Sequence, residues 1–125
     1  MAFNWQEYLE LAKELAGLQR SEYSRECAYR SAVSRAYYSA FCWCRNYAEK
    51  HSGFKPTGEA KDHKYLREYL RKLGKDWGKI ASKLDKLRRW RNKCDYDNDL
   101  NNIDLEGMVY QSIEISQEII EKCKL

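Results

Sequence analysis

Pro56 is the only proline in this chain of 125 residues, and that scarcity is the feature that most constrains its fold. With six glycines in addition, the chain keeps long segments free of residues that break helices. Apolar residues in these segments recur at spacings of three and four, as on one face of a helix, and no run alternates strictly as a strand does. The sequence therefore predicts an all-α protein whose helices pack in a bundle.

Capping signals suggest where the first two helices begin and end. The first is expected to open with Asn4 as its N-cap and to end near Gly17. The second is expected to run from about Ser21 or Ser24 to about His51. Its middle, residues 36–44, is apolar or aromatic nearly all round, which predicts that this helix lies at the centre of the bundle.

Three further helices complete the expected bundle. A short one covers about 60–73, and another runs from 77 to about 97 with Asp76 as a possible cap. After a turn cluster at 98–102, the last helix carries its apolar face on Leu105, Met108, Val109, Ser112, Ser116, Ile119 and Cys123. No internal repeat or second domain is expected.

Composition excludes several classes of protein. No stretch approaches the roughly 18 apolar residues that a membrane-spanning helix needs, and no secretory signal pattern opens the chain, so we expect no membrane association. The odd number of cysteines, five, favours reduced thiols and a cytoplasmic location. His51 and His63 lack partners at zinc-ligand spacing, so neither a metal nor another cofactor is expected.

Charge is distributed unevenly over the C-terminal half. Residues 71–93 contain ten Lys or Arg against Asp76 and Asp85, a net charge of +8, whereas residues 94–125 carry a net charge of −6. Adjacent helices with complementary solvated faces are the favoured explanation, since the whole chain carries only +4. A basic strip that contacts phosphates is the alternative.

An arginine interrupts the apolar stripe of the expected helix over 77–97. At about 100° per residue the stripe continues to Arg91, with Asp95 four residues further on. An unpaired buried charge costs several kcal/mol, so Arg91 requires a partner or lines a cleft. The stripe is formed by Trp77, Ile80, Leu84 and Leu87.

A second arginine, Arg35, lies beside aromatic residues that include Tyr38. We expect Arg35 and Asp95 to pair between the second and fourth helices, with Arg91 close by. Two interpretations of this cluster stay open. It is either a buried polar cluster that fixes the register of the helices, or a cleft where Arg91 and Asn92 contact a phosphate or a base.

Two segments resemble the HEPN superfamily of small helical-bundle proteins. They are Ser31-Ala-Val-Ser-Arg-Ala-Tyr-Tyr-Ser-Ala-Phe41 and Arg91-Asn-Lys-Cys-Asp-Tyr-Asp97. The resemblance covers about residues 5–123 in helix order and implies that residues 1–125 form one HEPN-like domain. It also implies the fold class, an all-α antiparallel four-helix bundle core (up-and-down) with an additional N-terminal helix. Frequent homodimers and frequent pairing with a minimal nucleotidyltransferase are further implications.

Many HEPN proteins are metal-independent ribonucleases with a motif of Arg, a polar residue, three to five residues and a His. Arg91 and Asn92 match its start, but Tyr96 and Asp97 stand where the histidine is expected. RNA cleavage benefits from a group with a pKa near neutrality, and a tyrosine, at about 10, is a poor substitute. If the chain is active at all, the resemblance assigns catalysis to Arg91, Asn92 and Tyr96.

Two functions therefore stay open. The favoured one is a non-catalytic or weakly catalytic dimeric module that binds a partner protein such as a nucleotidyltransferase, a nucleotide or RNA. The alternative is a divergent metal-independent endoribonuclease, a toxin-like component of a toxin–antitoxin or defence system. Binding is expected at a cleft formed by Arg35, Tyr38, Arg91, Asn92, Asp95 and Tyr96.

Trp90 is expected opposite the buried stripe, about 220° from Trp77. Trp and Arg are enriched at the centres of protein interfaces, so we predict a homodimer interface there. A stacking platform for single-stranded nucleic acid is the other possibility. The predicted surface comprises Arg88, Arg89, Trp90 and Lys93.

Overall fold

Helices account for all regular secondary structure in the residues that the computed structural model describes, 3–18 and 23–124. The predicted all-α bundle is confirmed. In chain order the helices are α1 (Gln6–Gly17), α2 (Arg25–Ser52), α3 (Asp62–Lys72), α4 (Lys75–Tyr96) and α5 (Leu105–Lys122).

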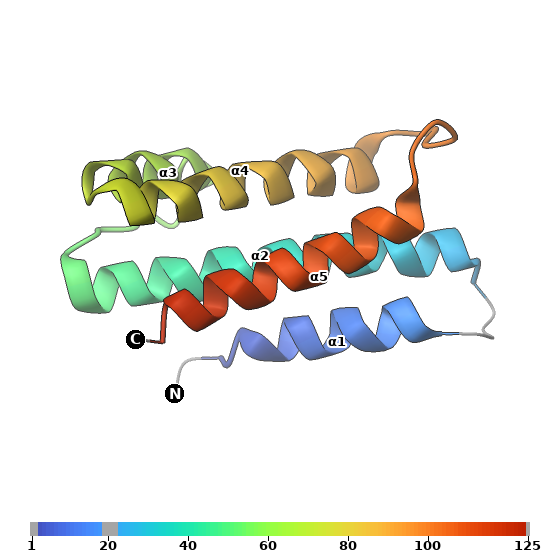
Figure 1. The fold of residues 1–125 in the computed structure, drawn as a ribbon, viewed down its shortest axis with the longest axis horizontal. Helices are drawn as coiled ribbons and strands as arrows, with labels where there is room; N and C mark the ends of the chain where they lie inside the picture. The colour runs from blue at the N-terminus through green and yellow to red at the C-terminus, as the bar shows by residue number, and fades with distance from the viewer. Residues whose placement is uncertain (1–2, 19–22, 125) are drawn as a thin grey trace.

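The long helices run up and down beside one another, with α2 in contact with most of the others (Figure 1). It packs against α1, α4 and α5, while the short α3 packs against α4. In the view of Figure 1, α3 and α4 form the upper layer, α2 and α5 the middle, and α1 the lower edge. Both chain termini lie at the end of the bundle where α2 ends.

Helix α2 begins and ends with clear local signals. The Ser24 side chain accepts a hydrogen bond from the Cys27 amide at 3.0 Å, so Ser24 is the N-cap, while Ser21 lies outside the described residues. The helix ends at Gly53, whose φ of 86° is a left-handed conformation that glycine adopts without strain.

Helix α4 begins two residues earlier than the sequence indicates. Gly74 occupies its N-cap position with φ 131°, and Asp76 lies in the first turn, so the prediction of Asp76 as the cap is wrong. A carboxylate in the first turn still interacts favourably with the helix dipole, which explains why the local pattern resembled a cap.

The centre of α2 is buried on nearly every side, as predicted. Ala32, Ala36 and Ala40 are fully shielded from solvent, and their small side chains let neighbouring helices approach closely. Buried serines bond to neighbouring segments: Ser39 donates to the Trp5 carbonyl, and Ser116 of α5 donates to the Ala36 carbonyl, both at 2.8 Å.

Trp90 belongs to the core and not to an exposed patch. It is half-buried and packs against both apolar clusters of the bundle. The prediction that it lies opposite the buried stripe is wrong because α4 contacts α2, α3 and α5 and therefore buries a wide arc. Only a helix packed on one side has the narrow stripe that the prediction assumed.

The arginine side chain of Arg30 anchors the end of α4 to α2. Its Nη1 atom donates to the carbonyls of Cys94 and Asp97, at 2.9 and 2.7 Å. These carbonyls belong to the last turn and C-cap of α4, where no intrahelical donor is available. The contact holds the segment from Arg91 to Tyr96 against α2.

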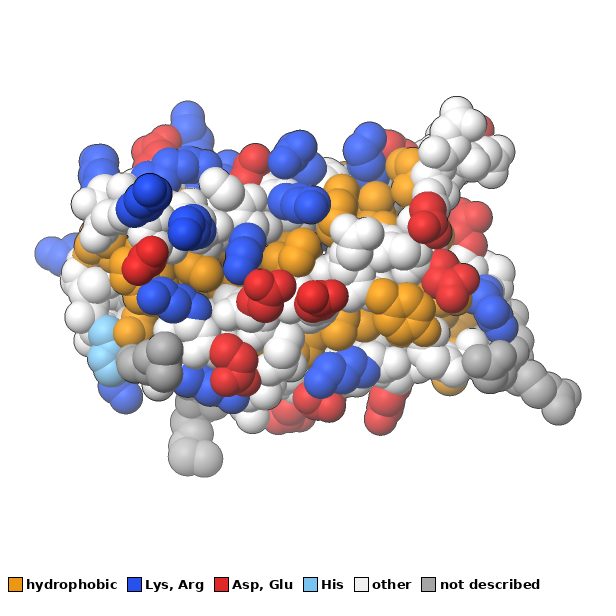
Figure 2. Space-filling model, in the orientation of Figure 1, with side chains coloured by type: hydrophobic (Ala, Val, Ile, Leu, Met, Phe, Trp, Pro, Cys, Tyr) orange, Lys and Arg blue, Asp and Glu red, His pale blue; other side chains and the backbone are white. Residues whose placement is uncertain are grey.

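The uneven charge of the sequence is partly resolved by contact between α4 and α5. Lys83 pairs with Glu118 at 2.9 Å, and Figure 2 shows Lys and Arg gathered over α3 and α4 with acidic side chains over α5. The prediction of complementary neighbouring helices is confirmed for this pair. Across the described part of the chain, no helix combines the length and apolar character that crossing a bilayer requires.

Asp62 organises the loop between α2 and α3. It is 4% exposed, and its carboxylate accepts hydrogen bonds from the Thr57 amide, the Thr57 hydroxyl and the Gly58 amide, at 2.7 to 3.0 Å. Burial raises the pKa of Asp62, but these hydrogen bonds outweigh burial and lower it overall.

We predict that Asp62→Ala destabilises the fold by about 2 kcal/mol, because it leaves the loop amides without an acceptor. Urea unfolding measures this change. Asp76→Ala, which removes an exposed acid from the first turn of α4, serves as the control and should cost less than about 0.5 kcal/mol. Equal losses in the two variants would contradict the role of Asp62.

Candidate functional site

Tyr38 of α2 contacts the guanidinium of Arg91 of α4. Arg91 Nη2 donates to the Tyr38 hydroxyl at 2.6 Å, and its guanidinium carbon lies 4.9 Å from the centre of the Tyr38 ring. The Arg91 side chain is only 14% exposed, so this contact takes place in a largely shielded environment. The structure thus confirms that the interrupted apolar stripe places an arginine between two helices.

Asp95 and Asn92 complete the environment of Arg91. Asp95 forms an ion pair with Arg91 at 2.8 Å and accepts a hydrogen bond from Ser34 of α2 at 3.3 Å. Asn92 accepts a hydrogen bond from Arg91 at 3.0 Å. Because the Asp95 side chain is 27% exposed, this cluster lies at the edge of the core and is open to solvent on one side.

Arg35 does not pair with Asp95. Its guanidinium lies over two aromatic rings, 4.7 Å from the centre of Tyr8 and 5.6 Å from that of Tyr38. The predicted partner is wrong because Arg91, four residues from Asp95 on the same helix, already occupies the carboxylate. Arg35 nevertheless remains next to the cluster through the Tyr38 ring.

Tyr96 lies at the solvent side of the same cluster. Its side chain is 71% exposed, and its ring centre is 5.6 Å from the Arg91 guanidinium. An exposed ring beside a largely shielded arginine offers a face on which a planar ligand can stack.

His63 of α3 also reaches this region, which the sequence analysis did not anticipate. Its Nδ1 atom forms a short hydrogen bond with the hydroxyl of Tyr37, and its ring stacks on Phe41 at a centroid distance of 4.1 Å. The signal was present in the sequence: His63 lies three and seven residues before Leu66 and Leu70, on the buried face of α3. The HEPN motif has its histidine after the arginine, whereas His63 precedes Arg91 in the chain.

Burial and positive charge keep His63 neutral. Burial, followed by the charges of Arg88, Arg91 and Arg67, lowers the pKa of His63 to about 4. Burial also raises the pKa of Tyr37, so the phenol keeps its proton. The neutral imidazole holds one proton, and the direction of its hydrogen bond with Tyr37 depends on which ring nitrogen carries that proton.

Arg88 faces inward, toward the same tyrosine and histidine. It is half-buried, and its Nε atom is shielded from solvent with no hydrogen-bond partner among the described residues. Its charge is the strongest of those that lower the pKa values of Tyr37 and His63. Assigning Arg88 to an outer basic surface was therefore wrong, because α3 covers that side of α4.

Arg67 of α3 completes the set of cations around His63. Arg67 Nη1 donates to the His63 carbonyl at 3.0 Å, while its Nε lies 3.6 Å from Asp85. Asp85 also approaches Arg89 at 3.4 Å. We refer to the side chains of Tyr37, Tyr38, His63, Arg67, Arg88 and Arg91 as the arginine cluster.

The other members of the predicted basic surface lie elsewhere on α4. Arg89 and Lys93 are exposed, and Trp90 packs into the core beneath Lys86, whose ammonium is 4.9 Å from the indole. These residues do not form one patch with Arg88. Within residues 3–18 and 23–124, no three His, Cys, Asp or Glu side chains are grouped as a metal site would need.

The lowered pKa of His63 predicts a pH-dependent contribution to stability. Between about pH 6.5 and pH 4 the unfolded chain binds a proton at His63 that the folded protein excludes, so stability falls as the pH falls through this window. Because the ring is half-buried, we expect a loss on the order of 1 kcal/mol, smaller than the full shift implies.

Urea unfolding at pH 7 and pH 4.5 measures this loss, with His63→Phe as the test variant. Phenylalanine keeps the stacking surface but cannot titrate, so the variant should show a correspondingly smaller pH dependence. The exposed His51 provides the matched control, and His51→Phe should behave as wild type. A wild-type pH dependence in His63→Phe would contradict the assignment.

Comparison with known proteins identifies one relative in an archaeon. The chain is 31% identical to "Uncharacterized protein MJ0992" of Methanocaldococcus jannaschii, in an alignment that covers 96% of this chain and 73% of the relative. No family model matches the chain. No solved structure matches it either. The extent and identity of the alignment show that the chain belongs to the same family as the archaeal protein MJ0992.

Proposed function

We propose that this protein is a HEPN-like module that binds RNA through the arginine cluster without cleaving it efficiently. The observation that carries the proposal is Arg88, a half-buried guanidinium that pairs with no carboxylate among the described residues. A partly shielded charge without an opposite charge is costly in a protein that binds nothing, and a phosphate oxygen is the acceptor that a guanidinium recognises best.

The charge balance of the cluster supports an anionic ligand. Asp95 compensates Arg91, and Asp85 is shared between Arg67 and Arg89. No carboxylate among the described residues pairs with Arg88, so the cluster retains positive charge.

Tyr96 favours RNA over an isolated phosphate as the ligand. Its exposed ring beside Arg91 provides a stacking surface next to a cation, and stacking of a base on such a ring contributes about 1–3 kcal/mol. Single-stranded RNA presents unstacked bases and phosphates together, whereas a duplex hides its base faces.

Ribonuclease activity is the second candidate because of His63. The sequence contains no histidine after Arg91, yet the fold brings an imidazole from α3 into the field of Arg88 and Arg91. However, Nδ1 of this imidazole is occupied by its hydrogen bond with Tyr37. Because the pKa of His63 is lowered to about 4, the imidazole is poorly matched to proton exchange near neutral pH, which favours binding over catalysis.

We predict that Arg88→Ala and Arg91→Ala each weaken binding of a fluorescently labelled single-stranded RNA by about tenfold or more. Fluorescence anisotropy in EDTA at fixed salt measures the affinity. Each variant should also make binding less dependent on salt, because one phosphate contact is lost.

Arg71→Ala is the matched control for this experiment, because Arg71 is an exposed arginine at the end of α3. It removes the same charge from the basic half of the protein but leaves the cluster intact, so we expect less than about a threefold change. If the three variants weakened RNA binding equally, the affinity would depend only on the net charge of the protein. That result would contradict the proposed site.

Cleavage of the same RNA separates the two candidate functions. We predict no metal-independent cleavage by the wild-type protein above the level of Arg91→Ala. Cleavage that is lost in both Arg91→Ala and His63→Phe would establish the ribonuclease instead.

Homodimerisation and pairing with a nucleotidyltransferase stay predictions from the HEPN resemblance. Trp90 is no longer the expected centre of the dimer interface, since it packs into the core. Light scattering at about 100 μM is expected to give the mass of a dimer, because even weak biological dimers associate at this concentration. A monomeric mass would contradict the prediction.

A further inference from the structure

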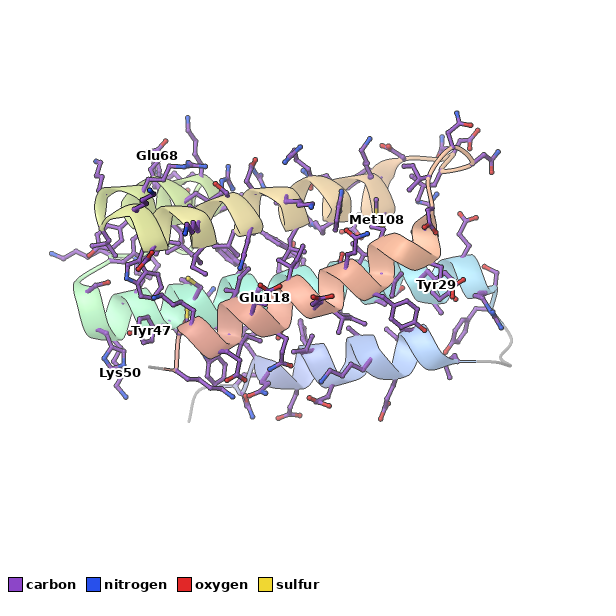
Figure 3. The ribbon with its side chains drawn as sticks, viewed as in Figure 1. Tyr29, Tyr47, Lys50, Glu68, Met108 and Glu118 are labelled. Carbon is purple, nitrogen blue, oxygen red and sulfur yellow. The ribbon has the colours of Figure 1, made fainter. Side chains whose placement is uncertain are left out.

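A second concave site lies at the end of the bundle where both termini meet, on α2 and α5 and beside the start of α1. It is a pocket of about 220 Å³ with aromatic walls formed by Phe3, Trp5, Trp43 and Tyr47. Figure 3 shows Tyr47 and Lys50 at this end of α2. None of these residues belongs to the arginine cluster or to the surface predicted from the sequence.

The polar groups of the pocket are few and point to a particular ligand chemistry. Asn46, Lys50 and His51 line it, and no carboxylate among the described residues does. The Asn46 oxygen accepts a hydrogen bond from Arg45 at 3.1 Å, which leaves the Asn46 amide NH₂ without a described partner. Lys50 is exposed and has no ion pair within the described residues.

Aromatic walls also suit a cationic ligand, but the protein's own cations already lie near two of these rings. Arg45 lies 5.8 Å from the centre of the Trp5 ring, and Lys124 lies 5.7 Å from that of Trp43. A cation in the pocket would meet these charges and Lys50. The C-termini of α2 and α5 lie nearby, but each carries only about half a negative charge, which solvent screens. The net charge around the pocket therefore stays positive.

We propose that this pocket binds a planar heteroaromatic ring that carries one anionic group, such as a purine nucleoside monophosphate. The ring stacks on Trp43, the Asn46 amide donates to its edge, and Lys50 neutralises the anion. At about 220 Å³ the pocket is smaller than the roughly 300–1,000 Å³ typical of pockets for drug-sized ligands, so it holds the ring system while the sugar and the anionic group lie at its mouth. This proposal is independent of RNA binding at the arginine cluster.

The indole N–H signals of the four tryptophans provide a direct test by two-dimensional NMR. Titration of AMP into the full chain should shift the signals of Trp5 and Trp43 with a Kd below about 1 mM, while Trp90 stays unchanged. Adenosine and ribose 5-phosphate should each bind at least fivefold more weakly, because each lacks one half of the recognised ligand. Choline is the cationic probe and should not shift Trp43.

Variants assign the binding to this pocket. Lys50→Ala should weaken AMP binding about fivefold or more, and Asn46→Ala should weaken it as well. Lys50 is exposed and Asn46 is half-buried, and neither belongs to the apolar core, so the fold is retained. Lys72→Ala, an exposed lysine on α3, is the matched control and should bind as wild type.

Three results would overturn the proposal: no saturable shift of Trp5 or Trp43, tighter binding of choline than of AMP, or equal weakening by Lys50→Ala and Lys72→Ala. Arg91→Ala should leave AMP binding at Trp43 unchanged. Loss of the Trp43 shift in that variant would place the nucleotide in the arginine cluster and would also contradict the proposal, whereas failure of RNA binding would not affect it.

Discussion

The structure depends on one constraint: α2 is buried on almost every side and yet carries polar side chains along one face. Arg30, Ser34, Tyr37 and Tyr38 recur at the spacing of a helical face and point toward α3 and α4. A buried polar group without a partner costs a few kcal/mol, so the neighbouring helices must supply one for each of them. The partners are the end of α4, Asp95, His63 and Arg91, and these contacts fix the register of the bundle.

The same contacts create the candidate site. The side chains that contact the tyrosines of α2 come from α3 and α4, and arginines of both helices lie close together there. Arg67, Arg88 and Arg91 all lower the pKa of His63. Two of these arginines have carboxylate partners, and Arg88 has none among the described residues. A polar cluster that only stabilised the fold would be expected to satisfy each donor. The excess positive charge is what connects the packing of α2 to the proposed binding of phosphate.

Much of the fold follows from the sequence, because helical periodicity and the absence of breakers are local signals. The central position of α2 was predictable from residues 36–44, and the placement of Arg91 followed from the apolar stripe of α4. The errors concern relations between helices. Periodicity shows which face of α4 is apolar, but not that three neighbours bury a wide arc, and so Trp90 and Arg88 were assigned to the surface.

The partners of charged groups were also only partly predictable. Local spacing identified Asp95 as a neighbour of Arg91, whereas the aromatic partners of Arg35 lie on α1 and α2 and required the tertiary structure. His63 was missed for a similar reason, because its contact with Tyr37 joins residues 26 positions apart. In both cases the helical sequence indicates which face of a helix is apolar, but not which residues of other helices that face contacts.

The central claim, that the hydrogen bond between Tyr37 and His63 joins α3 to α2 and holds the arginine cluster in place, is tested most directly by a double-mutant cycle. Tyr37→Phe, His63→Phe and the double variant keep the ring stacking and remove only the polar contact. Urea unfolding should give a coupling free energy of about 1 kcal/mol or more between the two positions. Strictly additive losses would show that the two side chains do not interact, and would contradict the account.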